Sequence, residues 1–125
     1  MKNRSLFARI GFALAGWKAA WARERSFRTQ ACLAIVALLA LLMIRPSPIW
    51  WAIVAVTCAL VLALELINSG LEGLIDLLHP EIHPEIKAIK DMLAGAVLMI
   101  SCAALAVAAA LMVAWVRAIL LRFET

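Results

Sequence analysis

Three long apolar runs dominate the pattern of hydrophobic and polar positions, and the last of them, Leu93 to Val116, contains no charged residue. A helix needs about 20 mostly apolar residues to cross the hydrocarbon core of a bilayer, which is about 30 Å thick. Within lipid, only helices and closed barrels satisfy all of their backbone polar groups. The pattern therefore predicts an all-α membrane protein with three spans, at about residues 27–45, 49–78 and 88–117.

The segment before the first span has a different pattern, in which apolar residues recur at helical spacing opposite Arg9 and Arg23. The apolar stripe consists of Phe7, Ile10, Leu14, Trp17 and Trp21. Such a pattern is typical of an amphipathic helix lying in the membrane interface, where tryptophan is favoured. We therefore predict a surface helix at about residues 5–25, and these residues alone favour the role of a simple membrane anchor.

A row of polar side chains extends along one face of the second predicted span. At about 100° per residue, this polar ladder consists of Glu65, Asn68, Ser69, Glu72 and Asp76. A helix rises about 24 Å from Ile49 to Glu65, so Glu65 lies deep in the membrane while Asp76 reaches water. An acid in a span costs about 3 kcal/mol on insertion scales and normally marks a partner, a cavity or a chemical task.

Composition and charge support this picture and orient it. Of 125 residues, 66% are hydrophobic, which excludes an ordinary soluble domain with a core. Basic residues are concentrated before the first span and recur between the second and third spans as Lys87 and Lys90, whereas Arg45 stands alone in the first loop. The positive-inside rule places the N-terminus and the second loop in the cytoplasm. Nothing in the chain suggests nucleic-acid binding. The basic residues before the first span are Lys2, Arg4, Arg9, Lys18, Arg23, Arg25 and Arg28.

Glu24, the repeat at 79–86 and Glu65 each fit two different roles. Glu24 is the only acid before Glu65, and it either pairs with a neighbouring arginine or reaches toward the polar ladder. The tandem His-Pro-Glu-Ile repeat at 79–86 predicts a turn, whose side chains contact either a polar ligand or a metal ion. Glu65 alone also fits a small proton-coupled exporter, although an exporter needs no ladder continuing into water.

The run Glu65-Leu-Ile-Asn-Ser-Gly-Leu-Glu-Gly-Leu-Ile-Asp76, with Lys90-Asp91 downstream, resembles the bacterial integral-membrane diacylglycerol kinase family. Glu24, Phe27 and Arg28 also match. The resemblance implies a homotrimeric bundle in the bacterial inner membrane. It further implies Mg²⁺-dependent transfer of the ATP γ-phosphate to a membrane lipid hydroxyl. The family includes undecaprenol kinases, so diacylglycerol (giving phosphatidic acid) and undecaprenol (giving undecaprenyl phosphate) both remain open as acceptors.

The resemblance also implies roles for individual residues. Glu65 matches the catalytic base, and Glu24 and Glu72 match the metal-holding carboxylates, while Asn68 and Asp76 belong to the same polar ladder. The nucleotide contacts are then Arg9, Glu24, Glu72, Glu81, Ile82, His83, Lys90 and Asp91. The lipid contacts are then Lys18, Ala19, Ala20, Trp21, Ser26, Phe27, Arg28, Thr29, Gln30, Glu65 and Ala94.

Overall fold

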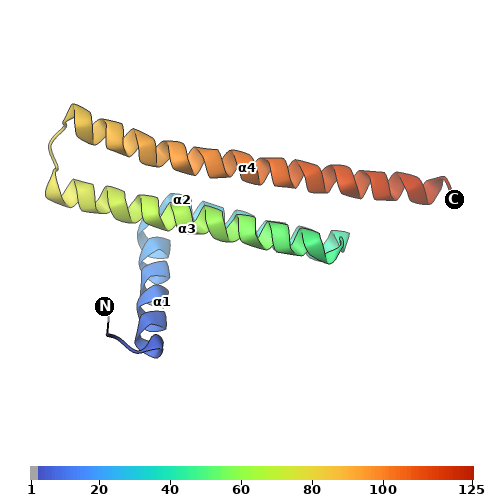
Figure 1. The fold of residues 1–125 in the computed structure, drawn as a ribbon, viewed down its shortest axis with the longest axis horizontal. Coiled ribbons are helices and arrows are strands. Elements are labelled where there is room, and N and C mark those ends of the chain that lie inside the picture. The colour runs from blue at the N-terminus through green and yellow to red at the C-terminus, as the bar shows by residue number, and fades with distance from the viewer. Residues whose placement is uncertain (1–2) are drawn as a thin grey trace.

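The computed structural model describes residues 3–125, so Lys2 lies outside the described part of the chain. These residues form four helices: α1 (Leu6–Arg23), α2 (Arg25–Ile44), α3 (Pro48–Leu78) and α4 (Pro84–Phe123). The last three lie side by side as an elongated bundle, and α1 projects sideways from it (Figure 1). By length and composition, α2, α3 and α4 can each cross a membrane. The predicted all-helical architecture with three long apolar helices is therefore confirmed.

The helix ends follow from local chemistry. Ser5 caps α1, because its hydroxyl accepts a hydrogen bond from the backbone N–H of Ala8 at 3.3 Å. Glu24 then adopts an extended conformation, which separates α1 from α2. Pro48 and Pro84 occupy first-turn positions in α3 and α4, where the missing backbone N–H costs nothing. Arg45 ends α2 in the left-handed conformation, with φ at 51°.

The bundle is held together along α3, which packs against both α2 and α4. Leu41 of α2, Val54 of α3 and Leu111 of α4 form its most buried cluster, near the end of the bundle at which α3 begins. Val54, Val61 and Glu65 are the buried positions of α3. Their spacings of seven and four residues keep one stripe of α3 facing its neighbours. The buried face of α3 therefore carries valines near the start of the helix and a carboxyl group, that of Glu65, further along it.

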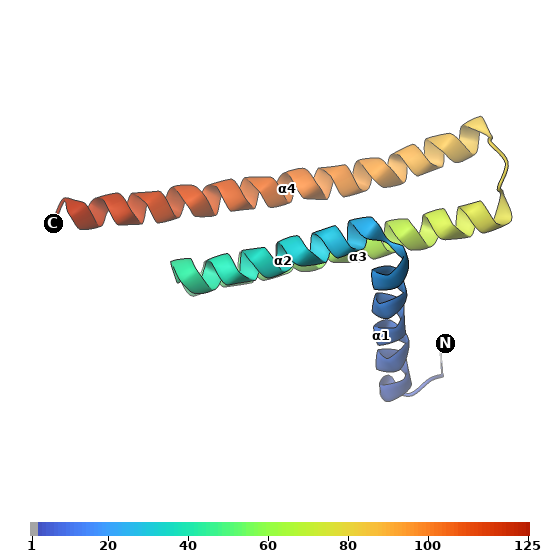
Figure 2. The same ribbon diagram turned by 180° about the vertical axis from the view of Figure 1, so that it is seen from behind.

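The outer surfaces of the long helices and much of α1 are apolar. Leu33 of α2, Leu98 of α4 and Phe7 of α1 are all well exposed. Only Ala20 of α1 is buried, near the end where that helix meets α2 and α3. Seen from behind, α1 again departs from the bundle at the start of α2 (Figure 2). Apolar outer surfaces of this extent fit a bundle surrounded by lipid.

Candidate functional site

Glu65 is the one buried charged side chain among residues 3–125, with 3% of its surface exposed. Its Oε1 atom accepts a hydrogen bond from the hydroxyl of Ser26. Ser26 belongs to the first turn of α2, where unpaired backbone N–H groups give the helix end a partial positive charge. The hydroxyl and this helix end together compensate part of the cost of burying a carboxylate.

Exposure rises along the polar ladder away from Glu65. Asn68, Ser69 and Glu72 are half-buried, and Asp76 is exposed. The Asn68 Oδ1 atom is buried and has no hydrogen-bond partner within residues 3–125. An unsatisfied buried acceptor of this kind invites a donor from a ligand or a neighbouring chain. The ladder thus joins a buried carboxylate to groups that water can reach, as the sequence predicted.

Lys90 of α4 supplies a positive charge next to Glu72 and Asp76, the more exposed end of the ladder, which we call its outer part. It forms an ion pair with Asp76, and the carboxylate of Glu72 also acts on its ammonium group electrostatically. Lys87 and Asp91 pair separately, at 2.6 Å between Nζ and Oδ2, on the exposed side of α4. Of the two lysines that begin α4, Lys90 is therefore the one held against the ladder.

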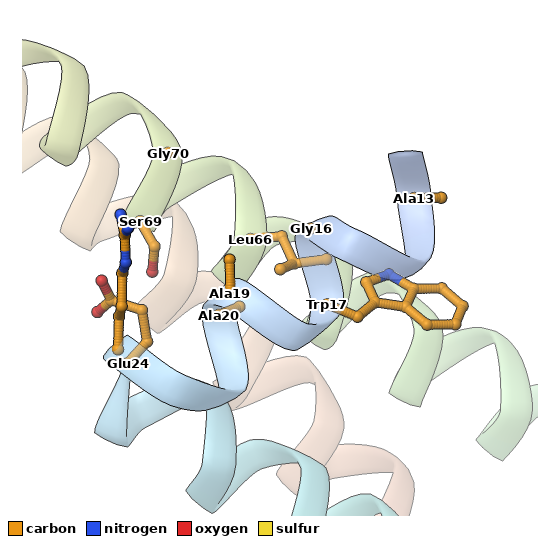
Figure 3. Close-up of a pocket in the computed structure, with 10 residues that line it drawn as sticks. Ala13, Gly16, Trp17, Ala19, Ala20, Glu24, Leu66, Ser69 and Gly70 are labelled. Atoms are coloured by element: carbon orange, nitrogen blue, oxygen red, sulfur yellow. The ribbon is translucent and has the colours of Figure 1, made fainter. Parts of the chain in front are cut away.

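Glu24, at the bend between α1 and α2, lines a cavity of about 440 Å³ between α1 and α3. Figure 3 shows Glu24 and Ser69 at one end of this cavity and Ala13 and Trp17 at the other. Arg23 also lines it, but Glu24 forms no ion pair within residues 3–125. Glu24 and Ser69 of the ladder thus line the same cavity, and so does Arg23, so both roles that the sequence left open for Glu24 stay predictions.

A second cavity, of about 360 Å³, opens between α2 and α4 with α3 as its floor. Its polar residues include Gln30 and Ser101, and the rest of its lining is mainly apolar. Gln30 follows Ser26 by one helical turn in α2, and Val61 precedes Glu65 by one helical turn in α3. The groove that Gln30 and Val61 line therefore begins next to the Ser26–Glu65 hydrogen bond. The buried carboxylate therefore lies between a polar ladder and an apolar groove, which we call the α2–α4 groove.

The bend itself is fixed by residues that the sequence placed on the lipid side. Arg28 donates to the backbone oxygen of Trp21 at 2.7 Å, and Thr29 donates to that of Arg25 at 3.1 Å. Phe27, between Ser26 and Arg28 in the chain, is buried. Lys18, Ala19, Ala20 and Trp21 form the last turns of α1, and Ala94 is exposed on α4. Of these residues, Arg28 is the one whose side chain joins the end of α1 to the start of α2, next to the cavity that Glu24 lines.

The structure does not bring every predicted site residue together. The first half of α1, which carries Arg9, extends away from the bundle (Figure 1). Glu81, Ile82 and His83 lie exposed in the connection between α3 and α4, and His83 caps α4 by accepting from the N–H of Glu85 at 3.1 Å. Within residues 3–125, no three His, Cys, Asp or Glu side chains converge as a metal site.

One contact and one unpaired polar atom could not be predicted from the sequence. The Ser26–Glu65 hydrogen bond joins residues 39 positions apart, and no local spacing signals it. The unpaired Asn68 oxygen also has no sequence signature, although its position on the ladder was predicted. A buried acid on a span did indicate that some partner exists.

Comparison with known proteins gives consistent relatives. The family model for prokaryotic diacylglycerol kinase matches residues 11–112. The chain is 32% identical to a diacylglycerol kinase of Helicobacter pylori (strain J99) over 96 residues, covering 77% of this chain and 75% of that protein. It is 34% identical to a diacylglycerol kinase of Synechocystis over 109 residues, covering 86% of this chain and 62% of that protein. It is also 37% identical to an undecaprenol kinase of Bacillus subtilis over 82 residues, covering 63% of this chain and 67% of that protein.

Proposed function

The chain belongs to the prokaryotic diacylglycerol kinase family, and from this premise we propose that it transfers the γ-phosphate of ATP to diacylglycerol, giving phosphatidic acid. The resemblance noted in the sequence is thereby confirmed at the level of a lipid kinase family. One observation carries the proposal most directly. The buried Glu65 carboxylate accepts a hydroxyl hydrogen bond at the junction between an apolar groove and the polar ladder.

Phosphoryl transfer depends mainly on positioning and on neutralising charge, and a base near the acceptor hydroxyl adds to the rate. The Ser26 hydroxyl already donates to Glu65, so a lipid hydroxyl that displaced it would find the same acceptor atom. In the proposed step, the hydroxyl oxygen bonds to the γ-phosphorus, its proton passes to Glu65, and ADP leaves with the former bridging oxygen. Glu65 is the proposed catalytic residue.

The proposed nucleotide side is the outer part of the ladder. Glu24 and Glu72 would hold Mg²⁺, which with ATP supplies charge neutralisation, and the remaining ligands would be phosphate oxygens and water. Carboxylates suit this hard cation, and both side chains are half-buried rather than fully solvated. Lys90, already drawn to the ladder by Asp76, would offset charge on the transferring group. The other proposed nucleotide contacts are Arg9, Glu81, Ile82, His83 and Asp91.

The proposed lipid side is the bend between α1 and α2 together with the α2–α4 groove. The groove begins one turn from the Ser26–Glu65 contact, and its mainly apolar lining suits an acyl chain. An acceptor whose hydroxyl reaches Glu65 could therefore leave its chain within protein rather than in open bilayer. The proposed lipid contacts at the bend are Lys18, Ala19, Ala20, Trp21, Ser26, Phe27, Arg28, Thr29, Gln30 and Ala94.

We also propose that the protein acts as a homotrimer in the bacterial inner membrane with its N-terminus in the cytoplasm. The unpaired Asn68 oxygen and the open outer ladder support completion of the site by a neighbouring chain. The excess of basic residues before α2 and at the start of α4 supports the orientation. ATP then meets the ladder from the side on which Lys90 lies.

Undecaprenol is the second candidate acceptor, because the Bacillus subtilis relative is an undecaprenol kinase. The deciding experiment is ATP turnover by the purified chain with each lipid supplied separately in the same detergent. Turnover with diacylglycerol well above that with undecaprenol supports the first proposal, and the reverse ratio supports the second. ATP turnover that is unchanged by either lipid would overturn both proposals.

A further inference from the structure

A third cavity, of about 300 Å³, lies at the end of the bundle opposite the outer polar ladder. It is enclosed by the turn between α2 and α3 and by the last turns of α4. Arg45 and Ser47 line it from the turn, and Arg122 lines it from α4. Trp50, Trp115 and Ile119 supply apolar walls. Two guanidinium groups from distant parts of the chain thus share one cavity with indole rings.

The charges around this cavity are not balanced by acids. The ion pairs within residues 3–125 are Lys87–Asp91 and Asp76–Lys90, so neither Arg45 nor Arg122 is paired there. Glu124 is the one acid in the chain beyond Asp91, and no acid occurs between Glu24 and Glu65. The N-terminus of α3 adds a partial positive charge here, whereas the C-termini of α2 and α4 add partial negative charges, so the positive character comes from the two guanidinium groups. The cavity is therefore electropositive as well as partly apolar.

The hydrogen-bonding groups of the turn are also available. Ser47 is the N-cap residue of α3, but its side chain makes no capping hydrogen bond. Arg45 holds a left-handed conformation that glycine or asparagine would normally occupy at a helix C-terminus. Arginine thus occupies a position that its backbone geometry disfavours, and Arg45 and Ser47 both line the cavity.

The tryptophans indicate the level of the cavity in the membrane. Trp50 lies in the first turn of α3, and Trp115 lies near the end of the apolar run of α4. Tryptophan side chains concentrate at the level of the lipid headgroups. Lipid phosphates are found at that level, and arginine binds phosphate oxygens through a planar pair of N–H donors.

We propose that this cavity binds the headgroup phosphate of an anionic phospholipid, held between Arg45 and Arg122 with Ser47 as a further donor. Trp50, Trp115 and Ile119 contact the glycerol and the first acyl carbons. The bound lipid joins the α2–α3 turn to the end of α4, so it stabilises the bundle without entering the lipid kinase site. The proposal is independent of which lipid is phosphorylated at Glu65.

The test uses the full chain, purified and delipidated in a maltoside detergent, with phosphatidylglycerol added. We expect phosphatidylglycerol to raise the thermal unfolding temperature and to remain as a one-to-one adduct in native mass spectrometry. Phosphatidylcholine at the same concentration should give a smaller shift, because its headgroup has no net charge. Inorganic phosphate should give almost none, because it lacks the apolar part. An equal shift with inorganic phosphate, or with phosphatidylcholine, would overturn the proposal.

Variants separate this site from general surface charge. Arg45→Gln and Arg122→Gln should each weaken phosphatidylglycerol binding by about tenfold or more, the loss expected when one hydrogen bond to a charged group is removed. Arg117→Gln is the matched control, because Arg117 lies on the same end of α4 but does not line the cavity. Equal losses in all three variants would reduce the effect to non-specific attraction and reject the site. Unchanged helix content by circular dichroism ensures that a lost adduct is not lost folding.

Discussion

Ser26 and Glu65 form a hydrogen bond between the first turn of α2 and the buried face of α3. The contact places the one buried carboxylate of residues 3–125 under the end of a helix, beside the bend from which α1 departs. Every part of the proposed chemistry is arranged around it. The α2–α4 groove lies on one side, and the ladder leading to Lys90 lies on the other.

Replacing Glu65 with glutamine should abolish lipid phosphorylation while leaving the fold intact. Glutamine keeps the shape and can still accept from Ser26, but it cannot take up a proton at neutral pH. Loss of a general base typically lowers the rate by about 10²- to 10⁴-fold. The measurement is lipid-dependent ATP turnover, with Glu124→Gln as a control that removes a carboxyl group at the other end of the bundle. Turnover within a factor of two of the native chain would exclude Glu65 as the base.

Replacing Ser26 with alanine should destabilise the protein, because the buried Glu65 carboxylate loses its donor. An unsatisfied buried group of this kind costs about 1–3 kcal/mol. Thermal unfolding in detergent measures the loss. Ser101→Ala is the matched control, since the Ser101 hydroxyl donates only to the Val97 oxygen of its own helix, at 2.8 Å. If the two variants unfold at the same temperature, the Ser26–Glu65 contact contributes nothing specific. Combining Ser26→Ala with Glu65→Gln should give less than additive destabilisation.

The sequence was sufficient to predict the shared face of the polar ladder and the burial of Glu65, because helical periodicity and the cost of a buried acid are local signals. The polar ladder from Glu65 to Asp76 follows from spacing on a single helix, and the structure has that stripe facing inward for most of its length. The predicted span of about residues 88–117 lies within the longer helix α4, whose start at Pro84 is set by local chemistry, because His83 caps it and proline suits the first turn.

Contacts between helices were beyond sequence reasoning for a different reason. The level at which Ser26 meets Glu65 is fixed by how α2 packs along α3, including the contact of Leu41 with Val54. That register depends on the shapes of many apolar side chains, and the three runs contain similar residues throughout. The cavity beside Glu24 depends on the extended backbone of Glu24 itself, which has φ at −108°. No proline or glycine next to Glu24 indicates this break between helices in the sequence.

Replacing Glu72 with glutamine should raise the Mg²⁺ concentration needed for half-maximal turnover by about tenfold or abolish activity, because Mg²⁺ is held by few protein carboxylates. A Mg²⁺ titration at saturating ATP and lipid measures this. Glu85→Gln is a suitable control, since Glu85 is exposed in the first turn of α4 and its side chain forms no ion pair within residues 3–125. An unaltered Mg²⁺ dependence in Glu72→Gln would remove Glu72 from the metal site.

Lys90 offers a test that separates catalysis from stability. Its ion pair with Asp76 is well exposed on the Asp76 side, where 63% of the side chain is accessible, so breaking it should leave the unfolding temperature almost unchanged. If Lys90 neutralises charge on the transferring phosphoryl group, Lys90→Gln should nevertheless lower turnover by about 10²-fold or more. Lys87→Gln, which breaks the neighbouring exposed pair with Asp91, should change neither property appreciably. Equal effects of the two lysine variants on turnover would show that general positive charge, rather than the position of Lys90 against the ladder, is what the reaction requires.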